Sequence, residues 1–335
     1  MKLDIGIGLT NDCNLDCSHC YSRENGIVNT LSFEEFKRLV DCVDVNSINF
    51  GTGESILYKD FIKIIEYLIV RNIKFSVTSN GYTVSKLPDD LLKQFNDIDI
   101  SFDFPTTWEN DLFRSSTSGS LALNALNKLK SIGVETSIAT CMTSLNFNRM
   151  SDMINLAREF DVNLRVNIYK PVYKDSLALT YDSFWKGVEI LLDSGLLISC
   201  SEPIVNTVLG TKILDGGCPC GKKSFRVTPT GHIVPCVYWK TTDCSIDQLA
   251  NKGIEALWQS ESFTKIRRIP EECLKCNYVD ICKGGCAARR YYNELTKPDP
   301  YCYVIRNLPQ PKLNWQYAES KDLVHASYLC TFIVK

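Results

Sequence analysis

Three cysteines near the start of the chain constrain it more than any other feature. Cys13, Cys17 and Cys20 follow the spacing C-x3-C-x2-C in a polar loop, directly after an apolar, strand-like run from Leu3 to Leu9. Iron–sulfur clusters are held by cysteine thiolates, and a cluster of four irons normally takes four of them. Three close cysteines without a fourth nearby leave one iron open, as a cluster with a chemical task requires. The alternative is a structural zinc site in which His19 is the fourth ligand.

With Asn14-Leu15 inside the motif and Tyr21 after it, this stretch resembles the signature of the radical S-adenosylmethionine (radical SAM) superfamily. The resemblance implies that the open iron binds the amino and carboxylate groups of S-adenosylmethionine. One electron from the cluster would then split this cofactor into methionine and a 5′-deoxyadenosyl radical, which takes a hydrogen atom from the substrate. The cofactor supplies the difficult chemistry, and the protein supplies ligation, orientation and a dry cavity.

Composition narrows the class of protein. A net charge of −2 over 335 residues gives no electrostatic footprint for nucleic acid. The N-terminus lacks a secretory signal, and the longest apolar runs fall short of the ~20 residues that a membrane span needs. The sixteen cysteines cluster in metal-ligand spacings and not as a disulfide framework, which predicts a reducing, largely anaerobic cytoplasm.

Residues 3 to about 195 alternate between short strand-like runs and helical patterns, which predicts βα units and a parallel sheet. The first helix is predicted to begin at Ser32, with Glu35 completing a capping box, and another helix is predicted to stop at Gly133. Six such units fit a partial (β/α)6 barrel of the triosephosphate-isomerase (TIM) type, the fold of the superfamily. The predicted strands are 3–9, 47–50, 74–79, 98–104, 136–143 and 164–169.

The composition changes from Asp215 onward, where glycine, proline and cysteine become dense and long periodic helices disappear. This places a domain boundary between residues 196 and 215. We predict an α/β partial barrel at 1–205, a small cysteine-rich α+β domain at 206–309, and a C-terminal tail at 310–335.

Two predicted strands end in short polar motifs, where a barrel of this kind carries its chemistry. Small residues allow the backbone to approach a ligand closely. The stretch Gly51-Thr52-Gly53-Glu54 resembles the GGE motif of the superfamily, which hydrogen-bonds the amino group of the cofactor, with Thr52 in place of the second glycine. Ser79-Asn80-Gly81 resembles the T/S-N-G corner near the cofactor. The alternative is that both are ordinary glycine-rich strand ends.

Polar residues on two later strands are further candidates. Ser101 and Asp103 alternate with phenylalanines, so both side chains share one face of the fourth strand. By resemblance this face points into the barrel, where Ser101 would meet the ribose or carboxylate of the cofactor and Asp103 is a candidate catalytic residue. Arg165 and Asn167 on the sixth strand are candidate cofactor ligands by the same logic. The alternative is a strand with one solvated face.

Cysteines recur in the C-terminal region as Cys220-x10-Gly231-x4-Cys236, then Cys273-x2-Cys276-x5-Cys282-x3-Cys286, then Cys302. This pattern resembles the SPASM domain, which binds two auxiliary four-iron clusters, so the chain would carry three [4Fe–4S] clusters. Carried over by resemblance, the outer cluster is held by Cys273, Cys276, Cys282 and Cys302. The inner cluster is held by Cys220, Cys236 and Cys286, with Cys218 or Cys244 as candidate fourth ligand. A zinc ribbon at Cys273-x2-Cys276 is the alternative.

Four cysteines remain outside these sets. We expect Cys42, Cys200 and Cys330 to be small buried side chains. Cys141 differs because it lies near the end of the fifth predicted strand. A thiol there could return a hydrogen atom to a substrate radical, as in radical SAM epimerases.

The resemblance implies a radical SAM/SPASM oxidoreductase. The preferred substrate is a ribosomally synthesised peptide, modified at carbon by cross-linking, oxidation or epimerisation, and two complete auxiliary sites favour oxidation. The alternatives are an enzyme acting on a small metabolite, such as a sugar or amino-acid derivative, and a non-catalytic iron–sulfur electron carrier. The motif Gly51 to Glu54 argues against the carrier, which needs no cofactor-binding strand end.

Two further features bear on the substrate and the partners. Val237 follows Cys236 where sulfatase-maturing members carry an aspartate, which argues against that activity. Since the first strand begins at residue 3, leader binding would need a separate protein. A flavodoxin or ferredoxin is the expected reductant.

Overall fold

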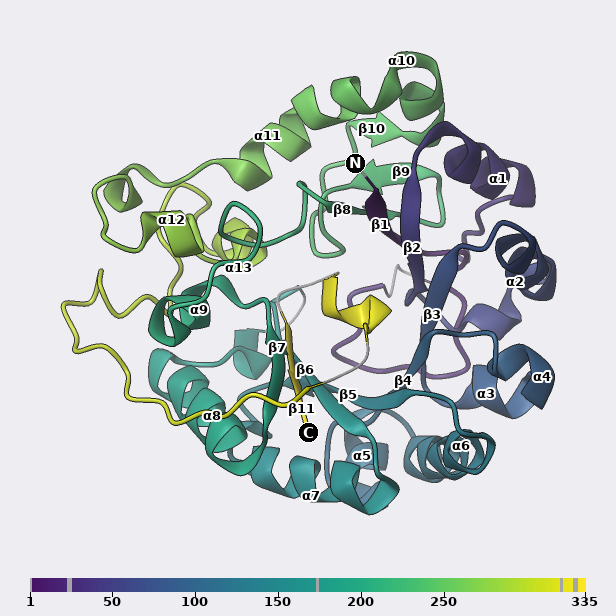
Figure 1. Cartoon of the computed structure of the whole chain (residues 1–335), viewed down its shortest axis with the longest axis horizontal. Coiled ribbons are helices and arrows are strands. Elements are labelled where there is room, and N and C mark those ends of the chain that lie inside the picture. The colour runs from purple at the N-terminus through teal and green to yellow at the C-terminus, as the bar shows by residue number, and fades with distance from the viewer. Residues whose placement is uncertain (1, 23–25, 173–174, 320–321, 328–330) are drawn as a thin grey trace.

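The computed structural model describes residues 2–22, 26–172, 175–319, 322–327 and 331–335. A curved sheet of eleven strands surrounds a central space, and helices cover its outer side (Figure 1). Six consecutive parallel strands form the partial barrel. They are β1 (Leu3–Ile7), β2 (Val45–Phe50), β3 (Lys74–Ser79), β4 (Asp97–Ser101), β5 (Thr136–Met142) and β6 (Asn163–Ile168). The molecule is therefore an α/β protein built on a parallel sheet, as predicted.

The strands alternate between an apolar outer face and a polar inner face. Ile48, Ile98 and Ile100 are buried in the core between the sheet and the helices. Asn49 on β2 and Arg165 on β6 lie on the opposite face, inside the barrel. The barrel interior therefore presents polar side chains to a ligand, beside small residues such as Gly6 and Ala139.

The helices around the barrel end as their local sequence dictates. The predicted capping box is present at Ser32 and Glu35, and the helix that follows buries Phe36, Leu39 and Val40. Helix α6 ends at Gly133, whose φ of 72° is left-handed, as expected for this position. The helices of this half are α1 (Phe33–Cys42), α2 (Phe61–Val70), α3 (Tyr82–Lys86), α4 (Asp89–Leu92), α5 (Thr107–Phe113), α6 (Ser118–Ile132), α7 (Met150–Phe160), α8 (Tyr181–Ser194) and α9 (Pro203–Leu209).

The cysteine-rich half adds strands to the same sheet. β8 (Ser224–Val227) pairs in parallel with β1, and β9 (His232–Val234) and β10 (Cys244–Ser245) continue antiparallel beyond it. The helices of this half are α10 (Ile246–Gln259), α11 (Glu261–Arg267), α12 (Val279–Cys282) and α13 (Ala287–Tyr292). The hydrogen-bonded sheet thus includes strands from both sides of the boundary predicted near residue 205. The domain boundary itself stays a prediction.

The last residues form more than the predicted tail. Strand β11 (Thr331–Val334) is fully buried and pairs antiparallel with both β6 and β7 (Leu197–Cys200), and it lies between them in the sheet. A short 3₁₀ helix, η5 (Val324–Ser327), lies in the middle of the ring of strands (Figure 1). Every helix among the described residues is too short or too polar to span a bilayer.

Candidate active site

A cavity of about 430 Å³ lies inside the barrel, between its strands and the loop that carries the first three cysteines. A volume of this size suits a cofactor together with a substrate group. Many of the predicted site residues line it: Cys13, Cys17, Cys20, Gly51, Thr52, Gly53, Glu54, Asn80, Ser101, Cys141, Arg165 and Asn167. Ser79 and Asp103 do not line it and are buried behind its wall.

The loop with the three cysteines rests on the end of β2. The backbone amide of Glu54 donates to the carbonyl of Asp12 (2.8 Å). Gly53 has a left-handed φ of 64°, and a Cβ there would lie 2.5 Å from the carbonyl oxygens of Asp12 and Thr10. This close approach of two backbones explains the glycine. Asn80 Nδ2 lies 3.6 Å from Cys13 Sγ, within reach of the hydrogen bonds that tune cluster sulfurs.

The carboxylate of Glu54 supports the neighbouring strand end. It accepts hydrogen bonds from Ser79 Oγ (2.5 Å), from the amide of Asn80 (3.0 Å) and from the amide of Thr83 (2.8 Å). Oε1 accepts from Ser79 and Thr83, whereas the described residues give Oε2 the amide of Asn80, so Glu54 joins the two strand ends at the cavity wall. No sequence motif pointed to Thr83.

Cys141 lines the cavity, and its backbone is held from behind by Asp103. Asp103 Oδ1 accepts from the amide of Cys141, and Oδ2 accepts from Arg114 Nε, both at 2.6 Å. Asn146 Nδ2 donates to the Cys141 carbonyl (3.0 Å). Burial raises the pKa of Cys141 to about 12, so the group remains a thiol that carries a hydrogen atom. The structure thus places Asp103 as a support for Cys141, and Arg114 is a cavity residue that sequence reasoning missed.

The proposed zinc alternative at the first motif needs His19 as a ligand. Its ring stacks on Phe113, with centroids 4.3 Å apart, and its Nε2 lies 3.6 Å from Asp103 Oδ2. The imidazole therefore lies at the cavity wall and packs on α5 through Phe113. Three cysteines without this histidine fit a cluster that has one open iron.

Two further sets of four cysteines come together in the second half of the chain. Each set lines a small cavity of its own: Cys218, Cys220, Cys236 and Cys286 line one, and Cys273, Cys276, Cys282 and Cys302 line the other. Hydrogen bonds from the thiols of Cys218 and Cys236 lower the pKa of Cys220 well below its usual value. Cys218 thus lies among the inner cysteines, whereas Cys244 is buried in the hydrophobic core and lines neither cavity.

These donor sets fit iron–sulfur clusters chemically. Burial raises the pKa of Cys273 to about 12 and that of Cys282 to about 11. Several thiolates can coexist at such a site only with a bound cation, and metal ions deprotonate their cysteine ligands. Among the remaining cysteines, Cys200 is buried as expected, but Cys42 is exposed, because it lies at the end of α1, beyond the buried Leu39 and Val40. Cys330 lies outside the described residues.

One aromatic ring separates the barrel cavity from the inner cysteine set. Tyr238 lines both cavities. The ring of Tyr21, directly after Cys20, meets it edge-on, with centroids 5.6 Å apart. Lys170 Nζ lies 5.3 Å from the centroid of Tyr238. The two cysteine-bearing loops are therefore joined through a pair of tyrosines.

Comparisons with known proteins agree with this geometry. The sequence matches the model of the radical SAM superfamily over residues 7–157 and that of an iron–sulfur cluster-binding domain, SPASM, over residues 218–286. It is similar to the mycofactocin maturase MftC of Mycobacterium tuberculosis (25% identity over 91% of this chain and 86% of the relative). It is also similar to AlbA, the antilisterial bacteriocin subtilosin biosynthesis protein of Bacillus subtilis (24% identity over 85% of this chain and 67% of the relative).

A solved structure shares the fold. The crystal structure of Streptococcus suis SuiB bound to the precursor peptide SuiA superposes with a TM-score of 0.72 at 16% identity, over 89% of this chain and 74% of that one.

Proposed function

Because the chain is a radical SAM enzyme with a C-terminal SPASM domain, we propose that it modifies a ribosomally synthesised peptide at carbon. The observation that carries the proposal is the composition of the barrel cavity. Cys13, Cys17, Cys20 and Cys141 line it, and Tyr238 lines both this cavity and that of the inner cysteine set. The names of the relatives support a peptide substrate, since one matures mycofactocin and another serves in the biosynthesis of a bacteriocin.

The cofactors have defined places in this proposal. Cys13, Cys17 and Cys20 would hold the radical cluster, and the two sets of four cysteines would hold the auxiliary clusters. When bound, the cluster and S-adenosylmethionine supply a 5′-deoxyadenosyl radical that takes a hydrogen atom from the substrate. The residues proposed to bind S-adenosylmethionine are Gly51, Thr52, Gly53, Glu54, Ser79, Asn80, Ser101, Arg165 and Asn167, with Ser79 acting through its hydrogen bond to Glu54.

The residues around the cavity favour an oxidative outcome, a cross-link or a dehydrogenation. Tyr238 lines both the barrel cavity and the cavity of the inner cysteine set, so an electron acceptor held by that set would lie close to the substrate. The competing outcome is epimerisation, in which the substrate radical regains a hydrogen atom. Cys141 carries the thiol for that step, and the buried carboxylate of Asp103 keeps it at the cavity wall.

Two partners complete the proposal. A flavodoxin or ferredoxin delivers electrons, and a separate protein binds the leader of the peptide. A reducing cytoplasm suits a chain whose described cysteines are all free thiols.

The first experiment tests the radical chemistry. Anaerobically reconstituted protein should hold about twelve irons per chain, four for each of three clusters. With dithionite and S-adenosylmethionine it should release 5′-deoxyadenosine and methionine. Replacing Cys13, Cys17 and Cys20 by alanine should abolish this release and retain the remaining iron. The matched control replaces Cys42 and Cys200 and should change neither. Cofactor cleavage by the triple variant would contradict the assignment.

The second experiment tests the substrate and the outcome. Short peptides encoded beside this gene are incubated with the enzyme in deuterated water and analysed by mass spectrometry. Oxidation removes two hydrogen atoms per modification and leaves no solvent deuterium on carbon. Uptake of one deuterium that depends on Cys141 would establish epimerisation instead. Turnover of a small metabolite with every peptide unchanged would contradict the peptide proposal.

A further inference from the structure

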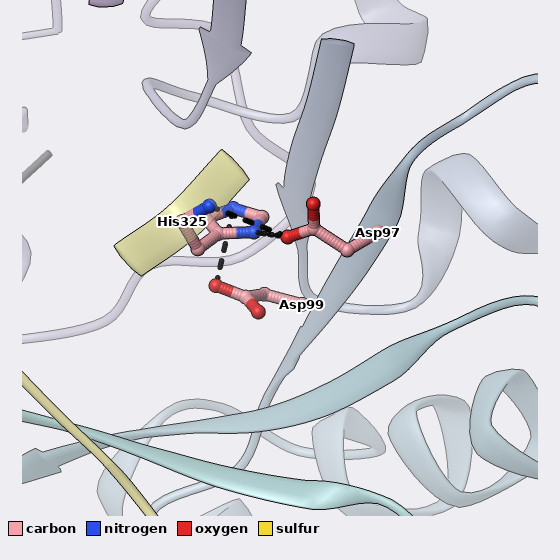
Figure 2. Close-up of side chains that lie close together, drawn as sticks. All are labelled: Asp97, Asp99 and His325. Carbon is pink, nitrogen blue, oxygen red and sulfur yellow. Dashed lines mark hydrogen bonds and ion pairs between the residues drawn. The ribbon is translucent and has the colours of Figure 1, made fainter. Parts of the chain in front are cut away.

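The C-terminal segment brings a histidine into the barrel from outside both matched domain models. Figure 2 shows His325, on η5, between Asp97 and Asp99 of β4. His325 Nδ1 pairs with Asp97 Oδ2, and Nε2 lies 3.1 Å from Asp99 Oδ2. The amide of Val324 donates to Asp97 Oδ1 (2.8 Å). The ring is 2% exposed and lines the barrel cavity, so this segment forms part of the cavity floor.

Asp99 connects His325 to an arginine of the cavity wall. Arg165 Nε pairs with Asp99 Oδ2, and both side chains are buried. Among the described residues, the terminal nitrogens of Arg165 make longer contacts, at 3.4 Å, with Asn167 Oδ1 and Thr78 Oγ1. Charge-assisted hydrogen bonds are about 2.7–2.9 Å long, so these nitrogens retain capacity for a stronger acceptor. One edge of the guanidinium is thus fixed by Asp99, and the other offers a fork that matches a carboxylate.

Charge and geometry define what the ring of His325 does. A carboxylate oxygen lies beside each ring nitrogen, so the ring of His325 is held between Asp97 and Asp99. Asn49 Nδ2 and Thr78 Oγ1 also lie 2.6 and 3.2 Å from Nε2. Arg165 adds a guanidinium cation to this group of His325, Asp97 and Asp99. Although three of these residues could ligate a metal ion, the adjacent guanidinium disfavours another cation.

We infer that His325 is a positioning residue for Arg165, acting through Asp99, and that Arg165 directs its terminal nitrogens at the carboxylate of S-adenosylmethionine. The inference rests on the proposed function, because it takes the barrel cavity as the cofactor site. It makes η5, which follows both matched domains, part of the active site.

The test compares two ligands that differ in the amino-acid portion. Affinities of the reconstituted protein for S-adenosylhomocysteine and for 5′-methylthioadenosine, which lacks the carboxylate, are measured anaerobically by calorimetry. The wild type should prefer S-adenosylhomocysteine. His325→Ala and Arg165→Ala should each reduce this preference by about tenfold or more, as expected for a lost hydrogen bond to a charged group. His232→Ala, on β9, is the matched histidine control and should leave the ratio unchanged.

Two additions separate positioning from general stability. Imidazole added to His325→Ala should restore the preference, because the ring site adjoins the cavity. His325→Gln, which keeps most of the volume, serves if the alanine variant does not fold. Equal weakening of both ligands, or an unchanged ratio in the His325 variants, would overturn the inference. A wild type that binds neither ligand would instead contradict the proposed function.

Discussion

Replacement of Gly53 by alanine tests how tightly the end of β2 supports the cysteine loop. The added Cβ would lie 2.5 Å from the carbonyl oxygens of Asp12 and Thr10, immediately before Cys13. Neither contact can be relieved by rotating a side chain, because both involve backbone. The loop that carries the first cysteine must therefore move.

The expected cost has two parts. A left-handed φ costs a residue with a Cβ about 1–2 kcal/mol, and overpacking costs about 1–3 kcal/mol, so Gly53→Ala should lose about 2–5 kcal/mol of unfolding free energy. Gly133 is the matched control, since its φ of 72° is also left-handed but a Cβ there meets nothing within 4 Å. Gly133→Ala should lose only the first part, about 1–2 kcal/mol.

The assay follows both stability and chemistry. Urea unfolding of the two variants gives the free energies, and release of 5′-deoxyadenosine reports the position of the loop. A displacement of about 1 Å can cost about 100-fold in rate, so Gly53→Ala should lose activity well beyond Gly133→Ala. Equal stability and equal activity of the two variants would refute the argument that backbone contact at Gly53 positions the cysteines.

Three further predictions concern buried polar groups. Glu54→Gln should lose about 1–3 kcal/mol of unfolding free energy in urea, because an amide N–H replaces an oxygen that accepts from N–H and O–H donors. An unchanged free energy would show that the carboxylate does not hold the two strand ends together. Arg289→Leu should lose about 3–5 kcal/mol by the same measurement, since it leaves two buried carboxylates without their cation. The control Lys265→Leu breaks an exposed ion pair and should lose no more than about 0.5 kcal/mol. Burial tends to raise the pKa of Asp97, but the charge and hydrogen bond of His325 lower it overall. The Asp97 carboxylate therefore stabilises the fold above about pH 3.9, its pKa in the unfolded chain, and this contribution is lost as the pH falls. Between about pH 5 and pH 3 the wild type should lose more stability than Asp97→Asn, and parallel pH profiles of the two proteins would contradict this.

Local chemistry determined much of what could be predicted. Cysteine spacing identifies ligand sets because a cluster draws several ligands from one short loop, and the capping box at Ser32 and Glu35 depends on residues three apart. Strand alternation placed Ser101 and Arg165 in the barrel, because side chains on a strand point to opposite faces in turn. These signals lie within a few residues, where the backbone leaves few arrangements.

Tertiary structure decided the contacts that hold these residues in place. The sequence indicated neither that Asp103 would hold the backbone of Cys141 nor that Glu54 would turn to Ser79. The same is true of β11, which joins the sheet beside β6, and of His325, which meets Asp97 across 228 positions of the chain. Such pairings depend on which distant segments the whole fold brings together, and the spacing of residues along the sequence does not indicate which segments will meet.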